Sequence, residues 1–117
     1  MAGIRDLVAA LRQREGVDAC IVLGRDGLLI DSQAIAGMIP DDLAARIPPI
    51  LGPADELGVA AGRGELVTAV LEMKHGVAIV SALSADAVLL VLVQPSANIG
   101  QLLYELRRNR QHIGALV

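Results

Sequence analysis

An unbroken apolar run near the end of the chain, residues 88–93, constrains the fold more than any other feature. It closes a series of three apolar segments, at residues 65–73, 77–83 and 87–94, which are joined by short polar turns. Short turns make consecutive strands antiparallel. An antiparallel sheet with one wet face alternates polar and apolar residues, but residues 87–93 contain no polar side chain. We therefore expect this strand to be covered by helices on both faces.

The beginning of the chain predicts a helix and a hairpin. Apolar residues in segment 4–14 recur at the spacing of one helical stripe, and Gly16 follows as a stop signal. Two apolar segments, residues 19–23 and 28–30, flank an Asp26-Gly27 turn. Aspartate followed by glycine favours the tight turn of a hairpin, because such turns need a positive φ. Two antiparallel strands are the expected result.

Proline interrupts the middle of the chain, residues 38–64, whose composition is otherwise helical. Pro40 precedes two aspartates, which is typical of the first turn of a helix. Pro48 and Pro49 remove two amide donors and are expected to stop that helix at Arg46 or Ile47. A second helical piece is predicted from residue 52 to residue 61. The pattern indicates a bent or two-part helix.

The final helix is predicted over residues 101–113, with Ser96 or Asn98 as its N-cap. The complete order is α-β-β-α-β-β-β-α. It predicts an α+β fold in which a five-stranded antiparallel sheet lies between two helical layers. At 117 residues the chain is expected to form a single domain, residues 1–117.

One edge of this sheet is predicted to attract a second copy of the chain. The strand at residues 65–73 carries no proline and has charge only near its ends. An unprotected edge is a template for pairing with another strand, and a twofold dimer satisfies it. The interface expected from this strand consists of Leu66, Val67, Thr68, Ala69 and Val70. The alternative is a monomer in which the edge is covered.

The composition excludes several classes of function. Tyr104 is the only aromatic residue and the net charge is −3, which disfavours nucleic acid as a partner. No segment has the roughly 18 consecutive apolar residues of a membrane helix, so no membrane insertion is expected. The charged N-terminal residues do not match a signal peptide. Cys20 is the only cysteine, which suits a reducing cytoplasm.

No catalytic constellation emerges from the motifs. The sequence lacks a phosphate-binding Gly-x-x-x-x-Gly-Lys-Ser/Thr loop, and its glycine-rich segment, residues 58–64, follows a predicted helix rather than a strand. His75 and His112 are far apart and have no neighbouring ligand residues. Cys20 lies in a predicted buried strand, which favours an inert thiol. We expect a protein that is not an enzyme and uses no cofactor or metal.

Two segments carry a resemblance to a known family. Residues 19–32 resemble the opening hairpin of the roadblock family, which includes the dynein light-chain roadblock type and bacterial and archaeal MglB-like proteins. Residues 88–108, with Asn98-Ile99-Gly100 and Leu103-Tyr104-Glu105-Leu106, resemble the closing strand and helix of that family. The order of elements agrees over essentially the whole chain. The resemblance implies a profilin-like roadblock domain.

The resemblance also implies partners. Roadblock domains are usually dimers, joined through the first strand of the meander with the middle helices side by side, which adds Leu57 and Ala61 to the expected interface. MglB-like members bind or activate a small Ras-like GTPase without donating a catalytic side chain. The middle helices form much of the GTPase-facing surface. The partner contacts expected there are Asp41, Asp42, Arg46, Asp55 and Glu56.

Two other functions remain as alternatives. The first is a dimeric scaffold subunit of a kinase, motor or membrane-associated signalling complex, which would bind its partner regardless of nucleotide. The second is a small-molecule sensor. The aliphatic core with few convergent polar groups disfavours a sensor, because ligand sites need such groups for orientation.

Overall fold

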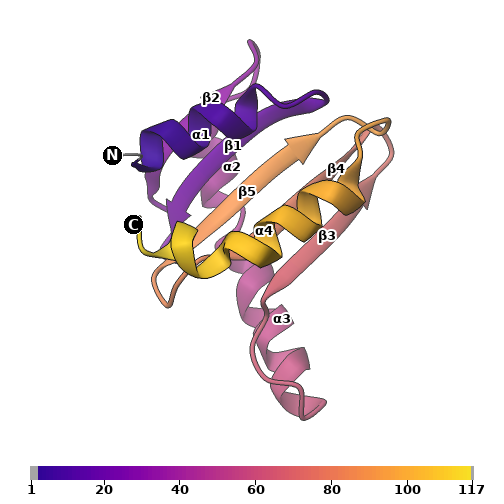
Figure 1. Cartoon of the computed structure of the whole chain (residues 1–117). Coiled ribbons are helices and arrows are strands. Elements are labelled where there is room, and N and C mark those ends of the chain that lie inside the picture. The colour runs from indigo at the N-terminus through magenta and orange to yellow at the C-terminus, as the bar shows by residue number, and fades with distance from the viewer. Residues whose placement is uncertain (1–2, 117) are drawn as a thin grey trace.

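An antiparallel sheet forms the middle layer of the computed structural model, which describes residues 3–116. Within these residues the strands are β1 (Val17–Gly24), β2 (Leu29–Ala34), β3 (Thr68–Met73), β4 (Gly76–Ala82) and β5 (Ala87–Val93). Their order across the sheet is β2-β1-β5-β4-β3 (Figure 1). β3, which the sequence predicted to be an edge strand, therefore lies at one edge of the sheet. β5 is central, and β2 forms the opposite edge.

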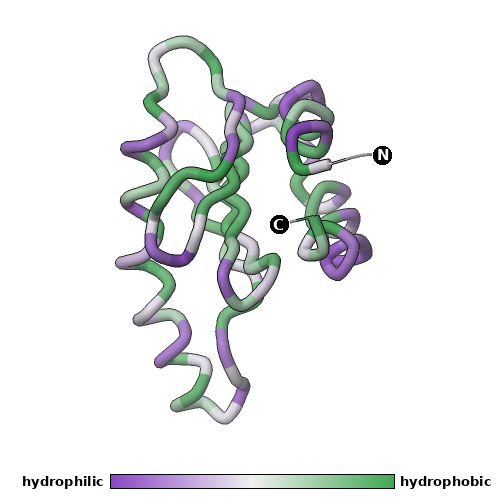
Figure 2. The backbone as a smooth tube through the Cα atoms, turned by 90° about the vertical axis from the view of Figure 1, so that its left-hand side faces the viewer, coloured by the Kyte–Doolittle hydropathy of each residue, from purple (hydrophilic) through white to green (hydrophobic). Residues whose placement is uncertain are grey.

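Helices cover both faces of the sheet, as the apolar run predicted. The helices α1 (Ile4–Arg12) and α4 (Ile99–Gly114) pack on one face, and α2 (Pro40–Ala45) and α3 (Pro48–Ala60) pack on the other. Figure 2 shows these three layers from the side, with the two terminal helices to the right of the sheet. Among residues 3–116 there is no helix both long and apolar enough to cross a membrane.

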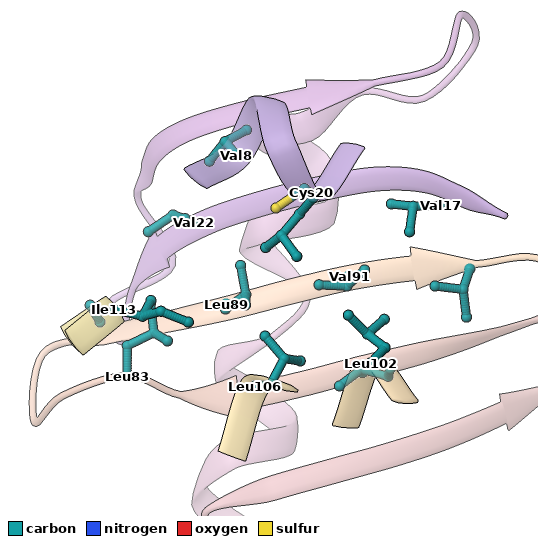
Figure 3. Close-up of a cluster of buried hydrophobic side chains, with 14 of the residues drawn as sticks. Val8, Val17, Cys20, Val22, Leu83, Leu89, Val91, Leu102, Leu106 and Ile113 are labelled. Atoms are coloured by element: carbon teal, nitrogen blue, oxygen red, sulfur yellow. The ribbon is translucent and has the colours of Figure 1, made fainter. Parts of the chain in front are cut away.

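The central strand β5 contributes to two separate cores. Leu89 and Val91 belong to the cluster beneath α1 and α4, together with Leu106 (Figure 3). Val88 and Leu90 belong to the cluster beneath α2 and α3. Successive side chains of a strand point to opposite faces, so one all-apolar strand supplies both layers. This explains why the run contains no polar residue.

The predicted hairpin is confirmed, and its turn depends on two residues. Gly27 has a φ of +89°, in the region that glycine occupies at little cost. The Asp26 carboxylate accepts a hydrogen bond from the Leu28 amide at 3.0 Å. Beyond the turn, Leu23 opposes Leu29 and Val22 opposes Asp31, so a bulge at Ile30 interrupts the ladder.

The middle helix is divided as expected, but the second piece begins earlier than predicted. α2 ends with Arg46 as its C-cap, and α3 starts at Pro48 rather than at residue 52. Pro48 and Pro49 begin a helix instead of only stopping one, because first-turn amides have no acceptor within the helix. Pro53 lies inside α3, where it deprives the Pro49 carbonyl of its usual donor. Pro49 is exposed, so water can replace that donor.

Several other boundaries also differ from the expectation. β2 continues to Ala34, although the second strand of the hairpin was predicted over residues 28–30. β3 begins at Thr68 rather than at residue 65. α4 begins at Ile99, after an N-cap at Asn98 whose side-chain oxygen accepts from the Gln101 amide at 3.1 Å. Of the two N-caps considered, the structure selects Asn98.

Candidate interaction surface

The outer edge of β3 presents unpaired backbone groups at alternate residues. The Val67 carbonyl accepts from the Ala82 amide at 2.9 Å, so these residues form a hydrogen-bonded pair with β4. Because such pairs alternate along an antiparallel ladder, the backbone groups of Ala69 and Leu71 also point toward β4. Those of Thr68 and Val70 point away from the sheet. β3 is therefore available for pairing with another strand.

α3 extends beyond the sheet that it covers. Its first half is anchored by Leu51, which is buried in the core beneath α2 and α3, and by Ile50, which packs against that core. Its second half passes the β3 edge and lies outside the outline of the sheet (Figure 1). There Leu57 is 72% exposed and Val59 is 63% exposed. Two large exposed aliphatic side chains on a helix end that lies beyond the sheet indicate an interaction surface.

The residues expected at the dimer interface separate into two groups. Leu57, Ala61, Val67 and Val70 are exposed. Leu66 and Ala69 are partly buried against the protein's own core. Thr68 is also partly buried, and its hydroxyl accepts a hydrogen bond from the Arg110 guanidinium of α4 at 2.9 Å.

The charged residues expected to contact a partner also differ in their surroundings. Asp41, Asp42 and Glu56 are exposed, and Asp42 forms an exposed ion pair with Arg46 at 3.3 Å. Asp55 is turned inward. One of its carboxylate oxygens lies 2.6 Å from the Arg25 guanidinium, and the other accepts from the Leu66 amide at 2.7 Å. Its carboxylate therefore connects α3 with the β1–β2 hairpin and with the segment before β3.

An apolar groove lies on the α2/α3 side of the sheet, where α3 does not cover it. Its walls include Met38 and Met73, its floor includes Ala78 and Leu92, and its volume is about 400 Å³. The sequence alone does not indicate this groove, because its parts come from a loop and three strands. An apolar residue at the exposed end of the edge strand, Met73, was the available signal.

The titratable side chains of the sequence analysis lie apart from one another in the part of the chain that the structure describes. Burial raises the pKa of the Cys20 thiol to about 12, and the nearby Asp31 carboxylate adds to this effect. Such a thiol is a poor nucleophile at neutral pH. His75 and His112 are both exposed. Within residues 3–116, no three His, Cys, Asp or Glu residues are grouped so that they could hold a metal ion.

The geometry defines an α+β sandwich with an exposed β3 edge and an apolar helix end beside it. The sequence matches the family model described as Roadblock/LC7 domain over residues 3–93. The chain therefore belongs to the Roadblock/LC7 domain family, as its hairpin and closing helix indicated.

Relatives and solved structures agree with this assignment. The proteins MJ1340 and MJ0310 of Methanocaldococcus jannaschii are each 26% identical to this chain over 106 residues, covering 91% of the chain and 92% of each relative. MglB of Myxococcus xanthus has a similar fold, with a TM-score of 0.87 at 14% identity over 97% of this chain and 93% of that one. A Roadblock/LC7 domain from Streptomyces avermitilis has a TM-score of 0.83 at 21% identity, covering 96% and 95%.

Proposed function

We propose that this protein is a non-catalytic homodimer that binds a small Ras-like GTPase and regulates it. The observation that carries the proposal is the similarity of fold to MglB over nearly the whole length of both chains. The open β3 edge and the exposed apolar end of α3 support self-association. A family in which MglB-like members regulate GTPases supports the choice of partner.

The GTPase-binding surface in this proposal consists of the exposed charges on α2 and α3. Asp41, Asp42, Arg46 and Glu56 lie on the solvent side of these helices. Asp55 acts indirectly here, because its carboxylate is already bound by Arg25 and by the Leu66 amide. It therefore positions α3 instead of contacting the partner. GTPase activation would arise by ordering the GTPase's own catalytic groups.

A binding titration tests this proposal directly. The purified protein is titrated with a Ras-like GTPase from the same organism, loaded either with GDP or with a non-hydrolysable GTP analogue. We expect binding at least tenfold tighter with one nucleotide. Lysine at positions 41 and 42, D41K and D42K, should weaken binding at least tenfold. Glu15→Lys is the matched control, because Glu15 is an exposed acid just after α1, a helix of the opposite layer. Equal binding of the two nucleotide states would contradict the regulatory role.

One observation favours a scaffold as the second candidate. The middle helix is divided between Arg46 and Pro48, as its prolines predicted, whereas in the roadblock family this helix is usually longer and continuous. A divided helix presents its charges along two axes, which suits a partner of a different shape. The titration separates the candidates, because a scaffold would bind its partner equally whichever nucleotide was present.

A further inference from the structure

The two outer layers of the molecule carry opposite charge. The terminal segments, residues 3–16 and 95–116, contain α1 and α4 and hold six arginines and three carboxylates. The middle segment, residues 38–66, contains α2 and α3 and holds five carboxylates and two arginines. The sheet lies between these two layers (Figure 2). Although the chain as a whole has a net charge of −3, one of its faces is therefore basic.

The six arginines of the α1/α4 layer fall into two groups. Three are bound within the protein, by the Val17 carbonyl, the Glu105 carboxylate and the Thr68 hydroxyl respectively: Arg12, Arg14 and Arg110. The other three, Arg5, Arg107 and Arg108, are exposed and form no ion pair with any residue between 3 and 116. The helix dipole favours cations only within the last turn, and α4 continues to Gly114. It therefore does not account for Arg107 and Arg108.

The outward side of α4 combines this charge with the only aromatic residue of the chain. Tyr104 follows the buried Leu102 by two residues, and Arg108 follows the buried Leu106 by two. Two residues turn an α-helix by about 200°, so both side chains point away from the sheet. They are four residues apart, which makes them neighbours on the helix surface. Tyr104 is 54% exposed, an unusual position for an aromatic ring unless it contacts a partner.

Few carboxylates oppose the charge of this face. Glu105 is the only acidic residue of α4, and it is paired with Arg14. Asp6 is exposed and accepts a hydrogen bond from the Gly3 amide at 3.0 Å, and Glu15 is exposed after the end of α1. The outward side of α4 therefore carries arginine and tyrosine without a competing acid.

Pairing of two copies would double the basic face. Directly opposed residues of an antiparallel pair point to the same side of a sheet, so two copies joined through β3 present both α1/α4 layers on one side. Each basic residue close to an anionic membrane strengthens binding by about fivefold. The three exposed arginines of one copy therefore contribute roughly a hundredfold, and the six of two copies contribute on the order of ten-thousandfold.

We propose that the α1/α4 layer binds peripherally to an anionic phospholipid membrane, with Tyr104, Arg107 and Arg108 at the level of the headgroups. A guanidinium forms paired hydrogen bonds with phosphate, and tyrosine is favoured at the membrane–water interface. No segment enters the hydrocarbon. The membrane repels the acidic α2/α3 layer, so this layer faces away and its charges stay accessible to the proposed GTPase. The inference goes beyond the proposed function, and only the strength of binding depends on the proposed dimer.

The fluorescence of Tyr104 tests the contact in the unmodified protein, because the chain has no other tyrosine and no tryptophan. Acrylamide quenching is measured with vesicles of phosphatidylcholine alone and with vesicles that also contain about 30% phosphatidylserine. We expect the anionic vesicles to lower the quenching constant at least twofold and the neutral vesicles to leave it unchanged. A protein that sediments with anionic vesicles while its quenching stays the same would bind through another face, which would overturn the proposal.

Charge reversal gives an independent measurement. Arg107→Glu combined with Arg108→Glu should weaken binding to the anionic vesicles at least tenfold. The matched control combines Arg46→Glu with Arg63→Glu, because both arginines are exposed in the opposite layer and the change in net charge is the same. This control should bind like the wild type. Raising the salt from about 0.1 M to about 0.5 M should release the wild type, since salt screens the attraction.

Three further outcomes would overturn the proposal. They are a wild type that does not bind the anionic vesicles, equal weakening by the two double variants, and tighter binding to a short DNA duplex than to the vesicles. A single aromatic residue leaves little for base stacking, so we expect the duplex to bind more weakly. GTPase binding and self-association are measured without vesicles, and failure of the membrane contact would leave both standing.

Discussion

Gly58 lies where α3 meets the segment that returns to the sheet. The Gly58 carbonyl accepts from the Arg63 amide at 2.7 Å, and a Cβ at position 58 would collide with the Gly64 carbonyl. Gly58→Ala should therefore lower the free energy of unfolding by about 1–3 kcal/mol.

Gly52→Ala is the control in the same helix, because a Cβ there meets nothing within 4 Å. It should raise the free energy of unfolding by about 0.5–1 kcal/mol. Urea titrations at one protein concentration compare the two variants, and equal shifts would contradict this account.

The buried thiol of Cys20 should make the folded protein less stable at alkaline pH. Its thiol has an ordinary pKa of 9.0, which burial raises to about 12 in the folded protein. Between these values the unfolded chain releases the proton and the folded chain retains it, so unfolding becomes easier as pH rises. The slope contributed is at most about 1.4 kcal/mol per pH unit. Urea unfolding from pH 8 to 10.5 should show this slope in the wild type and not in Cys20→Ala. Parallel pH profiles for the two proteins would refute it.

The contact between α3 and its surroundings depends on one carboxylate. Asp55 binds Arg25 at 2.6 Å and the Leu66 amide at 2.7 Å, and its side chain is only 21% exposed. Asp55→Ala should lower the free energy of unfolding by about 1–3 kcal/mol, because it leaves a guanidinium and an amide without their acceptor. Asp55→Asn should lower the free energy of unfolding by less, since its side-chain oxygen can still accept from the Leu66 amide.

Glu56→Ala is the control, because Glu56 is adjacent to Asp55 and exposed. It should change the free energy of unfolding by less than about 0.5 kcal/mol. Thermal unfolding measures all three, and an Asp55→Ala variant as stable as Glu56→Ala would show that the contact is unimportant.

The same carboxylate explains an element that the sequence placed inaccurately. Apolar residues from position 65 onward predicted an earlier start for β3, but the Leu66 amide donates to Asp55 and the strand begins at Thr68. That contact joins residues eleven positions apart, and local patterns carry no information about it. The start of α3 was misplaced for a related reason. Two consecutive prolines look the same in the sequence whether they begin a helix or end one. Here Leu51 packs into the core, and this tertiary contact favours a helix that begins at Pro48.

Features that depend on one segment were predictable. The all-apolar β5 predicted two cores, and Asp26-Gly27 predicted the hairpin, because both are properties of adjacent residues. The strand pattern put Leu66, Val67, Thr68, Ala69 and Val70 into one expected interface and could not tell that only Val67 and Val70 of these are exposed. The groove was not predictable either, since Met38 and Leu92 become neighbours only when the sheet forms. The internal role of Asp55 was missed for the same reason.

The molecule as a whole has an unequal pair of sheet edges. The two edge strands have the same length, six residues each, but β2 is interrupted by a bulge, a device that discourages pairing. At the β3 edge the ladder to β4 is regular from Thr68 to Met73, and α3 projects past it. A regular edge accompanied by an exposed apolar helix end favours addition of one further copy and no more, because a twofold dimer uses both features at once. The asymmetry between the edges therefore predicts a closed dimer.

Proline substitution along β3 distinguishes pairing within the chain from pairing between chains. The Val70 amide points away from β4, so Val70→Pro removes only a donor to a second copy, and edge strands tolerate such prolines. The Leu71 amide points toward Ala78, so Leu71→Pro breaks the sheet itself. We expect Val70→Pro to remain folded by circular dichroism and to sediment as a monomer, while Leu71→Pro unfolds. Val70→Thr keeps the amide and should remain dimeric. A Val70→Pro protein that dimerised as tightly as the wild type would place the interface elsewhere than on β3.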